Sequence, residues 1–303
     1  MKFILSVVIA TSSLFAAVSA HAIVKRDAAA GPHWDYSGDK TGPDHWGLLD
    51  PAYVTCETGM QQSPIDINKE TLSRFVQCAK KALTFDYKPV KDAVAHFTGQ
   101  TVEIDWNPGP KSHNNSIAIG KKQYNLIQFH FHTPSEHRIN GRHAAAPGPP
   151  QPRRQVPGCH RRPPQAQARN VPFFHYLTAL QKKVHADKRA SAVAAAPGTT
   201  SAVIEELLKD SICAGTQPTS EEATKVNYPL PIVDFAPLVR ALKGFTPRWE
   251  YSGSLTTPPC SENVAWNVMH DPYPIGLDQL RALVDLQGYN ARDIEDSRRP
   301  AHE

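Results

Sequence analysis

Short runs of alternating hydrophobic and polar residues recur between Asp27 and about His143, and they predict β-strands. The run TVEIDW at 101–106 is one example, with an apolar residue at every second position. Side chains two positions apart on a strand share a face, so this alternation is typical of a strand buried on one side. Glycine and proline separate the runs, as at Gly42-Pro43 and at 107–110. The pattern predicts a β-rich domain with antiparallel strands.

Two later segments, 201–209 and 277–286, carry apolar residues at helical spacing instead. We therefore expect helices around the sheet. The predicted fold class is mainly β, of the α+β kind.

The first 20 residues predict an export signal. Lys2 precedes a short apolar run that ends in the small residues Val18-Ser19-Ala20, which is the layout of a signal peptide cleaved near Ala20. The run is too short for a membrane anchor, and no other stretch approaches 18 apolar residues, so we expect no membrane span. Residues 21–26 end in Lys25-Arg26, which is either a dibasic propeptide site or a chance basic pair. We expect a secreted, extracellular protein, in which disulfides can form.

Residues 144–172 break the pattern. Eight of these 29 residues are proline and five are arginine, with no acidic or aromatic residue among them. Proline fixes φ and lacks the backbone donor, so neither a strand nor a helix is expected, and a disordered basic linker is the simplest interpretation. The segment also explains the composition of the whole chain, because without its five arginines the net charge of +4 becomes −1, and without Cys159 the five cysteines become four. The basic charge is therefore poor evidence for an acidic partner. No nucleic acid is expected either, since the arginines lack interleaved aromatic residues.

The strongest local signal is the run QFHFH at 128–132. On a strand His130 and His132 point to one face, while Phe129 and Phe131 point to the other face and into a core. Two imidazoles on one face suit zinc, which prefers tetrahedral nitrogen ligands. Gln128 shares that face and is placed to set the tautomer of His130. An isolated H-x-H is more often a pair of surface or core histidines; here the alternating phenylalanines and the following SEH at 135–137 favour a metal site.

A second signal is the run YSGSLTTPPC at 251–260. Its two prolines favour extended backbone before them and hold the loop in place. Thr256 and Thr257 would then present hydroxyls from a rigid loop. The alternative is an ordinary turn in which the threonines are neutral.

Together these stretches resemble the α-class carbonic anhydrases. The resemblance extends over most of 33–143 and 200–300. It implies a single domain, 27–303, interrupted at 144–172 and built on a large twisted, mostly antiparallel β-sheet with peripheral helices. The matching stretches are HWG at 45–47, QSPIDI at 62–67, IQFHFH at 127–132, SEH at 135–137, 251–260, Val264, Trp266 and Arg299-Pro300.

The resemblance implies a secreted zinc lyase that hydrates carbon dioxide reversibly to bicarbonate. Zn²⁺ held by three histidines lowers the pKa of its bound water, and the resulting hydroxide attacks carbon dioxide. Partner proteins are not indicated. The roles carried over are zinc binding for His130 and His132, orientation of the hydroxide for Thr256 with Glu136, product seating for Thr257, the pocket wall for Leu255, Val264 and Trp266, a structural role for His137, and a Cys56–Cys260 disulfide. Cys78 and Cys213 then form a pair by remainder.

Two departures from the family bear on activity. Gln100 stands where the family often has a proton-shuttling histidine, with His96 or His113 as candidate substitutes. Counted without gaps, the third zinc ligand falls on Pro149 and the glutamate that orients it falls on Pro147. With two ligands zinc affinity should collapse. The nearby histidines are His143, His160 and His175. The alternative function is therefore an inactive, zinc-free carbonic-anhydrase-like binding or structural protein.

The genetic code offers an explanation for the anomalous segment. Read one base later, codons for Val156–Arg162 are compatible with YLAVIGV, which reads as a buried strand. Those for Ala145–Pro150 become compatible with LHLVHL, which contains the missing histidine. Our hypothesis is that 144 to about 168 is an out-of-frame translation, with a few residues lost after His143.

Overall fold

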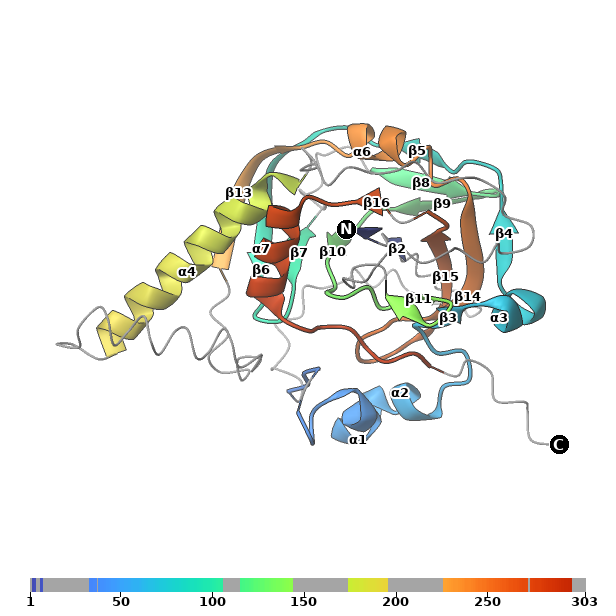
Figure 1. Cartoon of the computed structure of the whole chain (residues 1–303), viewed down its shortest axis with the longest axis horizontal. Helices are drawn as coiled ribbons and strands as arrows, with labels where there is room; N and C mark the ends of the chain where they lie inside the picture. Colours follow the sequence, from blue (N-terminus) through green and yellow to red (C-terminus); the bar gives the residue numbers. More distant parts are fainter. Residues whose placement is uncertain are drawn as a thin grey trace, which may run out of the picture.

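Two four-stranded antiparallel sheets form the main body of the structure (Figure 1). The computed structural model describes residues 2–3, 6–7, 33–36, 38–105, 115–143, 174–195, 226–271 and 273–295. One sheet has the order β10 (Gln128–His130), β7 (Val102–Asp105), β6 (Val90–Phe97) and β13 (Val226–Val233). The other has the order β2 (Ser6–Val7), β15 (Glu262–Met269), β14 (Arg248–Ser254) and β4 (Gln77–Ala79).

Three smaller sheets complete the strands of the described residues. The first contains β5 (Thr84–Asp86), β8 (Ser116–Ile119) and β9 (Lys122–Asn125). The second contains β12 (Arg142–His143), β11 (Arg138–Ile139) and β3 (Asp66–Ile67), in which β11 and β3 run parallel. The third pairs β1 (Lys2–Phe3) with β16 (Tyr273–Pro274).

Helices lie outside the sheets, and most of them are short (Figure 1). They are η1 (Pro43–His45), α1 (Trp46–Leu49), η2 (Pro51–Tyr53), α2 (Thr55–Thr58), α3 (Lys69–Arg74), α4 (Tyr176–Ala195), α6 (Ala236–Ala241) and α7 (Leu277–Gln287). The mainly β fold class predicted from the alternating pattern is confirmed.

The main core forms where the alternation is clearest. On β6 the side chains of Ala93, Ala95 and Phe97 are buried, and on β7 so are Val102 and Ile104. All five belong to one hydrophobic cluster. The sheet therefore follows from the two-residue period of the sequence.

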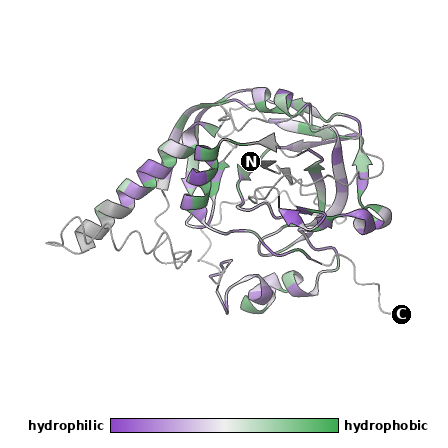
Figure 2. Ribbon diagram, viewed as in Figure 1, coloured by the Kyte–Doolittle hydropathy of each residue, from purple (hydrophilic) through white to green (hydrophobic). Residues whose placement is uncertain are grey.

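Helix α7 confirms the helix predicted over 277–286. Its leucines Leu280, Leu283 and Leu286 are buried in the same cluster as β6 and β7. Figure 2 shows hydrophobic and hydrophilic residues mixed on this helix, as expected when only one face is buried. Helix α4 lies beside it, and His185 Nε2 on α4 is 2.9 Å from Asp285 Oδ2 on α7.

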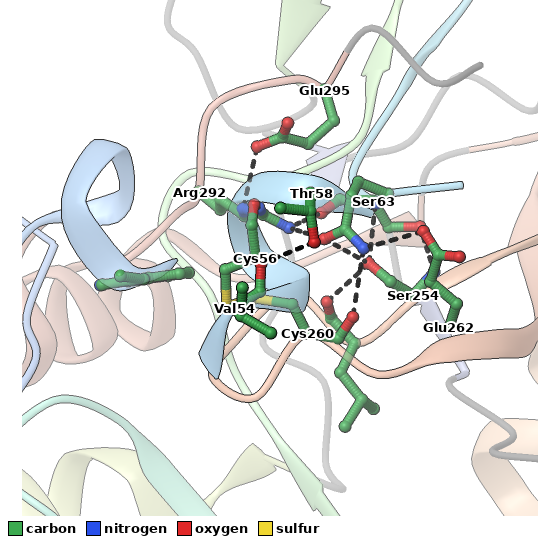
Figure 3. The surroundings of a disulfide bond; sticks show 12 residues. Val54, Cys56, Thr58, Ser63, Ser254, Cys260, Glu262, Arg292 and Glu295 are labelled. Carbon is green, nitrogen blue, oxygen red and sulfur yellow. Dashed lines mark hydrogen bonds and ion pairs between the residues drawn. A yellow bond between two sulfur atoms is a disulfide. The ribbon is translucent and has the colours of Figure 1, made fainter. Parts of the chain in front are cut away.

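The predicted Cys56–Cys260 disulfide is present and spans a sequence separation of 204 residues (Figure 3). It belongs to a small cluster with Tyr36 and Trp46. Cys78 is also disulfide-bonded. Its predicted partner, Cys213, lies outside the described residues.

Several other predictions lie wholly or mostly outside the described residues. They are the helix at 201–209, the segment 144–172, His113, His160, and Arg299-Pro300. Of the expected signal peptide, residues 2–3 and 6–7 are described, and Ser6–Val7 pair with Asn267 and Val268 of β15. The predictions of export and of a propeptide at 21–26 remain predictions. Among the described residues, no helix combines the length and hydropathy needed to cross a membrane.

Candidate metal centre

His130 and His132 lie side by side, with their Nε2 atoms 3.0 Å apart. His130 is the last residue of β10, and His132 follows just beyond the strand. On the opposite face Phe131 is buried in the main core, and Phe129 packs against it. The two-residue period thus separates a polar face with two imidazoles from an apolar face that anchors the segment.

The other ring nitrogen of each histidine meets an oxygen acceptor. Nδ1 of His130 lies 3.0 Å from Gln128 Oε1, and Nδ1 of His132 lies 2.6 Å from the backbone oxygen of Asn290. A carbonyl oxygen can only accept, so both Nδ1 atoms carry the proton of a neutral imidazole. Burial lowers the pKa of His130 to about 3 and that of His132 to about 4, which keeps both rings neutral.

Two neutral rings protonated at Nδ1 direct their Nε2 lone pairs at one another. Because both ring protons are on Nδ1, neither Nε2 atom can donate to the other across the 3.0 Å that separates them. A cation placed between the rings would bind both lone pairs. The pair therefore fits zinc in donor type and in direction, with Gln128 and Asn290 as the groups that set the tautomers.

The number of ligands is smaller than a zinc site needs. Among the residues that the structure describes, no group of three or more His, Cys, Asp or Glu side chains is placed to hold a metal. Nδ1 of His143 donates to the backbone oxygen of Ser135 at 2.5 Å, and His175 is exposed. His96 contacts Asn227 Oδ1 instead. A third ligand would have to come from outside the described residues.

Glu136 lies beside the histidine pair and is nearly inaccessible to solvent. Its Oε1 is 3.5 Å from His132 Nδ1, and the backbone N–H of Arg292 donates to the same oxygen at 3.3 Å. The Thr256 hydroxyl also bonds this carboxyl group. Burial raises the pKa of Glu136 to about 8, against the opposing effects of Thr256 and Arg292. When Glu136 is ionised, the Thr256 hydroxyl can only donate to it, which leaves the hydroxyl oxygen free to accept a hydrogen bond.

The loop that carries Thr256 is held at several points. Leu255 N donates to Ser261 O at 3.0 Å, and Cys260, inside the disulfide, donates its N–H to Thr257 O at 2.8 Å. Just before the loop, a Cβ on Gly253 would lie 2.2 Å from Ser63 Oγ, so this position requires glycine. These contacts agree with the rigid loop expected from the two prolines.

The other predicted site residues are placed as follows. Thr257 and Leu255 are partly exposed, whereas Val264 and Trp266 are each 1% exposed within a second hydrophobic cluster that Leu255 packs against. Their roles in seating product and forming the pocket wall stay predictions. Nε2 of His137 contacts the Tyr251 hydroxyl at 2.6 Å, and its ring packs 4.5 Å from that of Trp266. His137 therefore has hydrogen-bonding and ring partners in the core.

Three buried residues near this site are not predicted from the sequence: Gln287, Asn290 and Arg292. Each is at most 1% exposed. Gln287 carries a visible signal, because it lies four residues after Leu283 and so places an amide on the apolar face of α7. The two terminal nitrogens of the Arg292 guanidinium donate to residues 56–63, more than 200 positions away, and no local sequence pattern predicts these bonds.

Comparison with known proteins finds a matching family model and relatives described as carbonic anhydrases. The family model described as eukaryotic-type carbonic anhydrase matches residues 41–147 and 186–303. A carbonic anhydrase of Nostoc sp. is 26% identical over 263 residues, covering 87% of this chain and 82% of the relative. Alpha carbonic anhydrase 4 of Arabidopsis thaliana is 28% identical over 262 residues, covering 85% and 79%. The solved structure of a fungal alpha carbonic anhydrase from Aspergillus oryzae superposes with a TM-score of 0.58 at 23% identity, covering 87% of this chain and 93% of that one. This last likeness is one of fold.

Proposed function

The chain belongs to the eukaryotic-type carbonic anhydrase family, and on that premise we propose that it is a zinc lyase that interconverts carbon dioxide and bicarbonate. The observation that carries the proposal is the pair of imidazoles at 130 and 132. Their Nε2 lone pairs converge at 3.0 Å while both Nδ1 atoms are bound by oxygen acceptors. Neutral histidines in this arrangement are suited to bind a cation, and poorly suited to any role without one.

His130 and His132 would hold the zinc ion, together with a third ligand from outside the described residues. Bound zinc supplies a Lewis acid that makes water acidic enough to hydrate carbon dioxide at neutral pH. When Glu136 is ionised, Thr256 donates to its carboxylate, which leaves the hydroxyl oxygen to accept a hydrogen bond and so to select one orientation of the attacking group. The disulfide at Cys260 and the bonds within 255–261 keep that hydroxyl in place.

We also propose that residues 144 to about 168 are read out of frame. The family match supports this, because it stops at 147 and resumes at 186, so the interruption contains most of the proline-rich segment. Restoring the frame would supply LHLVHL, with a histidine as the third ligand, in place of AAPGPP at 145–150. Sequencing the transcript across these codons tests the hypothesis. An in-frame message that still spells PGPPQP would refute it.

The function itself is tested on the purified full chain that the transcript encodes. Zinc content is measured by mass spectrometry and carbon dioxide hydration by stopped flow, with about one zinc ion per chain expected. His132→Ala should abolish zinc binding and activity. His185→Ala is the matched control, because His185 lies on α4 and pairs with Asp285 of α7 rather than with the histidine pair.

A zinc-free, inactive chain would favour the alternative, a carbonic-anhydrase-like binding or structural protein. The small number of ligands among the described residues is the observation behind this second candidate. Export from the cell remains part of the proposal. It rests on the signal-like residues 1–20 and on the disulfides at Cys56 and Cys78. N-terminal sequencing of protein from the medium tests it, and a mature chain is expected to start near His21, or near Asp27 if the dibasic site is cleaved.

A further inference from the structure

Two buried amide side chains meet the backbone around His132. Gln287 is the last residue of α7, and Asn290 follows three positions later; they are 1% and 0% exposed. We name these two residues the amide corner. Buried amides are costly unless they are hydrogen-bonded, so the bonds they make indicate what they are for.

Gln287 joins β7 to the segment after β10. Its Oε1 accepts from the backbone N–H of Val102 at 3.3 Å. Its Nε2 lies 3.2 Å from the backbone oxygen of Phe131 and 3.3 Å from Thr133 Oγ1. A further contact at 3.2 Å, to the side-chain oxygen of Asn290, links the two amides.

Asn290 completes the enclosure of His132. Its Oδ1 accepts from the backbone N–H of Thr133 at 2.7 Å, and its Nδ2 donates to the backbone oxygens of Phe131 at 3.1 Å and Gln100 at 2.9 Å. Its own backbone oxygen accepts the His132 ring proton. The neighbours of His132 on both sides, and its ring, are therefore bonded to this corner.

The reason for the corner lies in where the strand ends. The ladder between β10 and β7 extends only from Gln128 to His130. His130 is held by the sheet, but His132 lies beyond the last ladder pair. The amide corner supplies hydrogen bonds to Phe131 O and Thr133 N, the positions where the ladder no longer does.

We propose that Gln287 is a positioning residue for His132, acting through Asn290 and the backbone of 131–133. The importance of this role for catalysis rests on the proposed function, in which His132 binds zinc. The positioning itself does not depend on a metal. It can therefore be tested separately.

The test compares Gln287→Met with Gln279→Met in the full chain. Methionine approximates the volume of glutamine but makes none of its amide hydrogen bonds. Gln279 is the matched control, because it is a glutamine on the same helix, 2% exposed, whose Oε1 accepts from Gly276 N at the far end. Both variants should lose stability in urea. A purely structural role for Gln287 predicts no other difference between them.

The decisive readout is the His132 Nδ1–H signal in metal-free protein, observed by NMR with ¹⁵N-labelled histidine. In Gln287→Met this proton should exchange with solvent about tenfold faster, while the Nδ1–H of His130 and both protons in Gln279→Met keep their rates. Competition with a chelator for Zn²⁺ should show about a tenfold weaker affinity in Gln287→Met only, the usual cost of losing an outer contact to a ligand.

Unchanged exchange at His132 in Gln287→Met would overturn the proposal. If that variant does not fold, Gln287→Glu keeps the shape and the acceptor for Val102 N–H, and the same comparison applies. Absence of zinc binding in every chain, with altered His132 exchange in Gln287→Met, would remove the proposed function but leave the positioning role intact.

Discussion

Replacing Arg292 by methionine should be among the most damaging single changes in this fold. Its side chain is 1% exposed and bonds residues 56–63 to the segment that follows α7 (Figure 3). Nη1 donates to Gln62 Oε1 at 2.9 Å and to Ser63 O at 2.8 Å, and Nη2 donates to Cys56 O at 2.9 Å. Nε is 2.9 Å from Glu295 Oε1. The guanidinium also lies over the Trp46 ring, 5.6 Å from its centroid.

The magnitude follows from what would be left behind. Hydrogen bonds from a charged donor contribute about 1.5–3 kcal/mol each, and a buried acceptor that loses its partner costs about 1–3 kcal/mol. Methionine fills part of the volume, and the carboxylate of Glu295 is 32% exposed, so the full sum will not be realised. Removing one member of a buried pair usually costs about 3–5 kcal/mol, and we expect Arg292→Met to lose that much of the free energy of unfolding.

The assay is urea unfolding with the disulfides intact, and its control is Arg74→Met. Arg74 also pairs with a glutamate, Glu70 at 3.1 Å, but the two side chains are 48% and 72% exposed. Exposed helical pairs contribute only about 0.3–0.5 kcal/mol. Equal m-values would show that the midpoints report stability. A loss of under about 1 kcal/mol for Arg292→Met, close to that of Arg74→Met, would refute this account of the buried network.

Three further predictions concern the disulfide, acid stability and proton transfer. Cys56→Ser should lower the free energy of unfolding by up to about 5 kcal/mol, which is the chain-entropy value for a loop closed across 204 residues. Adding reductant should then shift the urea midpoint of the variant less than that of the parent. Burial lowers the pKa of His137 to about 3, so the unfolded chain gains a proton below about pH 6.5 that the folded chain refuses. Stability should therefore fall between about pH 6.5 and 3 by up to about 1.4 kcal/mol per pH unit for this group, and His137→Asn should reduce the measured slope by about one proton. In the zinc-loaded enzyme, the rate of carbon dioxide hydration should rise with imidazole buffer concentration, because Gln100 cannot carry a proton and its amide donates to Trp34 O at 2.5 Å. Gln100→His should reduce that dependence on buffer. A hydration rate that is independent of buffer in the parent would contradict the prediction.

The parts of the molecule that sequence reasoning reached are those with a local period. The strand at 102–105 and the helix Leu277–Gln287 each repeat one simple pattern, and burial on one face enforces it. The face shared by His130 and His132 follows from the same two-residue period. The acceptor for the His130 ring proton is also predictable from the sequence, because Gln128 lies two residues earlier on the same strand.

The features that the sequence does not predict depend on contacts between segments that are distant along the chain. The acceptor for His132 is a backbone oxygen 158 positions away, and any residue at 290 would present one. Arg292 looks like an ordinary surface arginine in the sequence, yet it fills a buried site made by Cys56, Gln62 and Ser63. Tertiary packing decides which of these groups are buried and bonded, and a short window of neighbouring residues does not contain that information.

The anomalous segment, 144–172, bears both on zinc binding and on the completeness of the sheet. Among the described residues, β10 pairs with β7 on one side only, and the second edge of β15 meets only Ser6 and Val7. Strand edges that lack partners favour aggregation. A restored reading frame would supply LHLVHL and YLAVIGV, two strand-like runs, and the first of them carries the missing histidine. Because one stretch would provide both the ligand and the strands, a chain that lacks zinc for this reason should also be a chain with an incomplete sheet. Loss of metal and loss of stability would then have the same origin, the codons after His143, rather than two independent defects in an otherwise intact site.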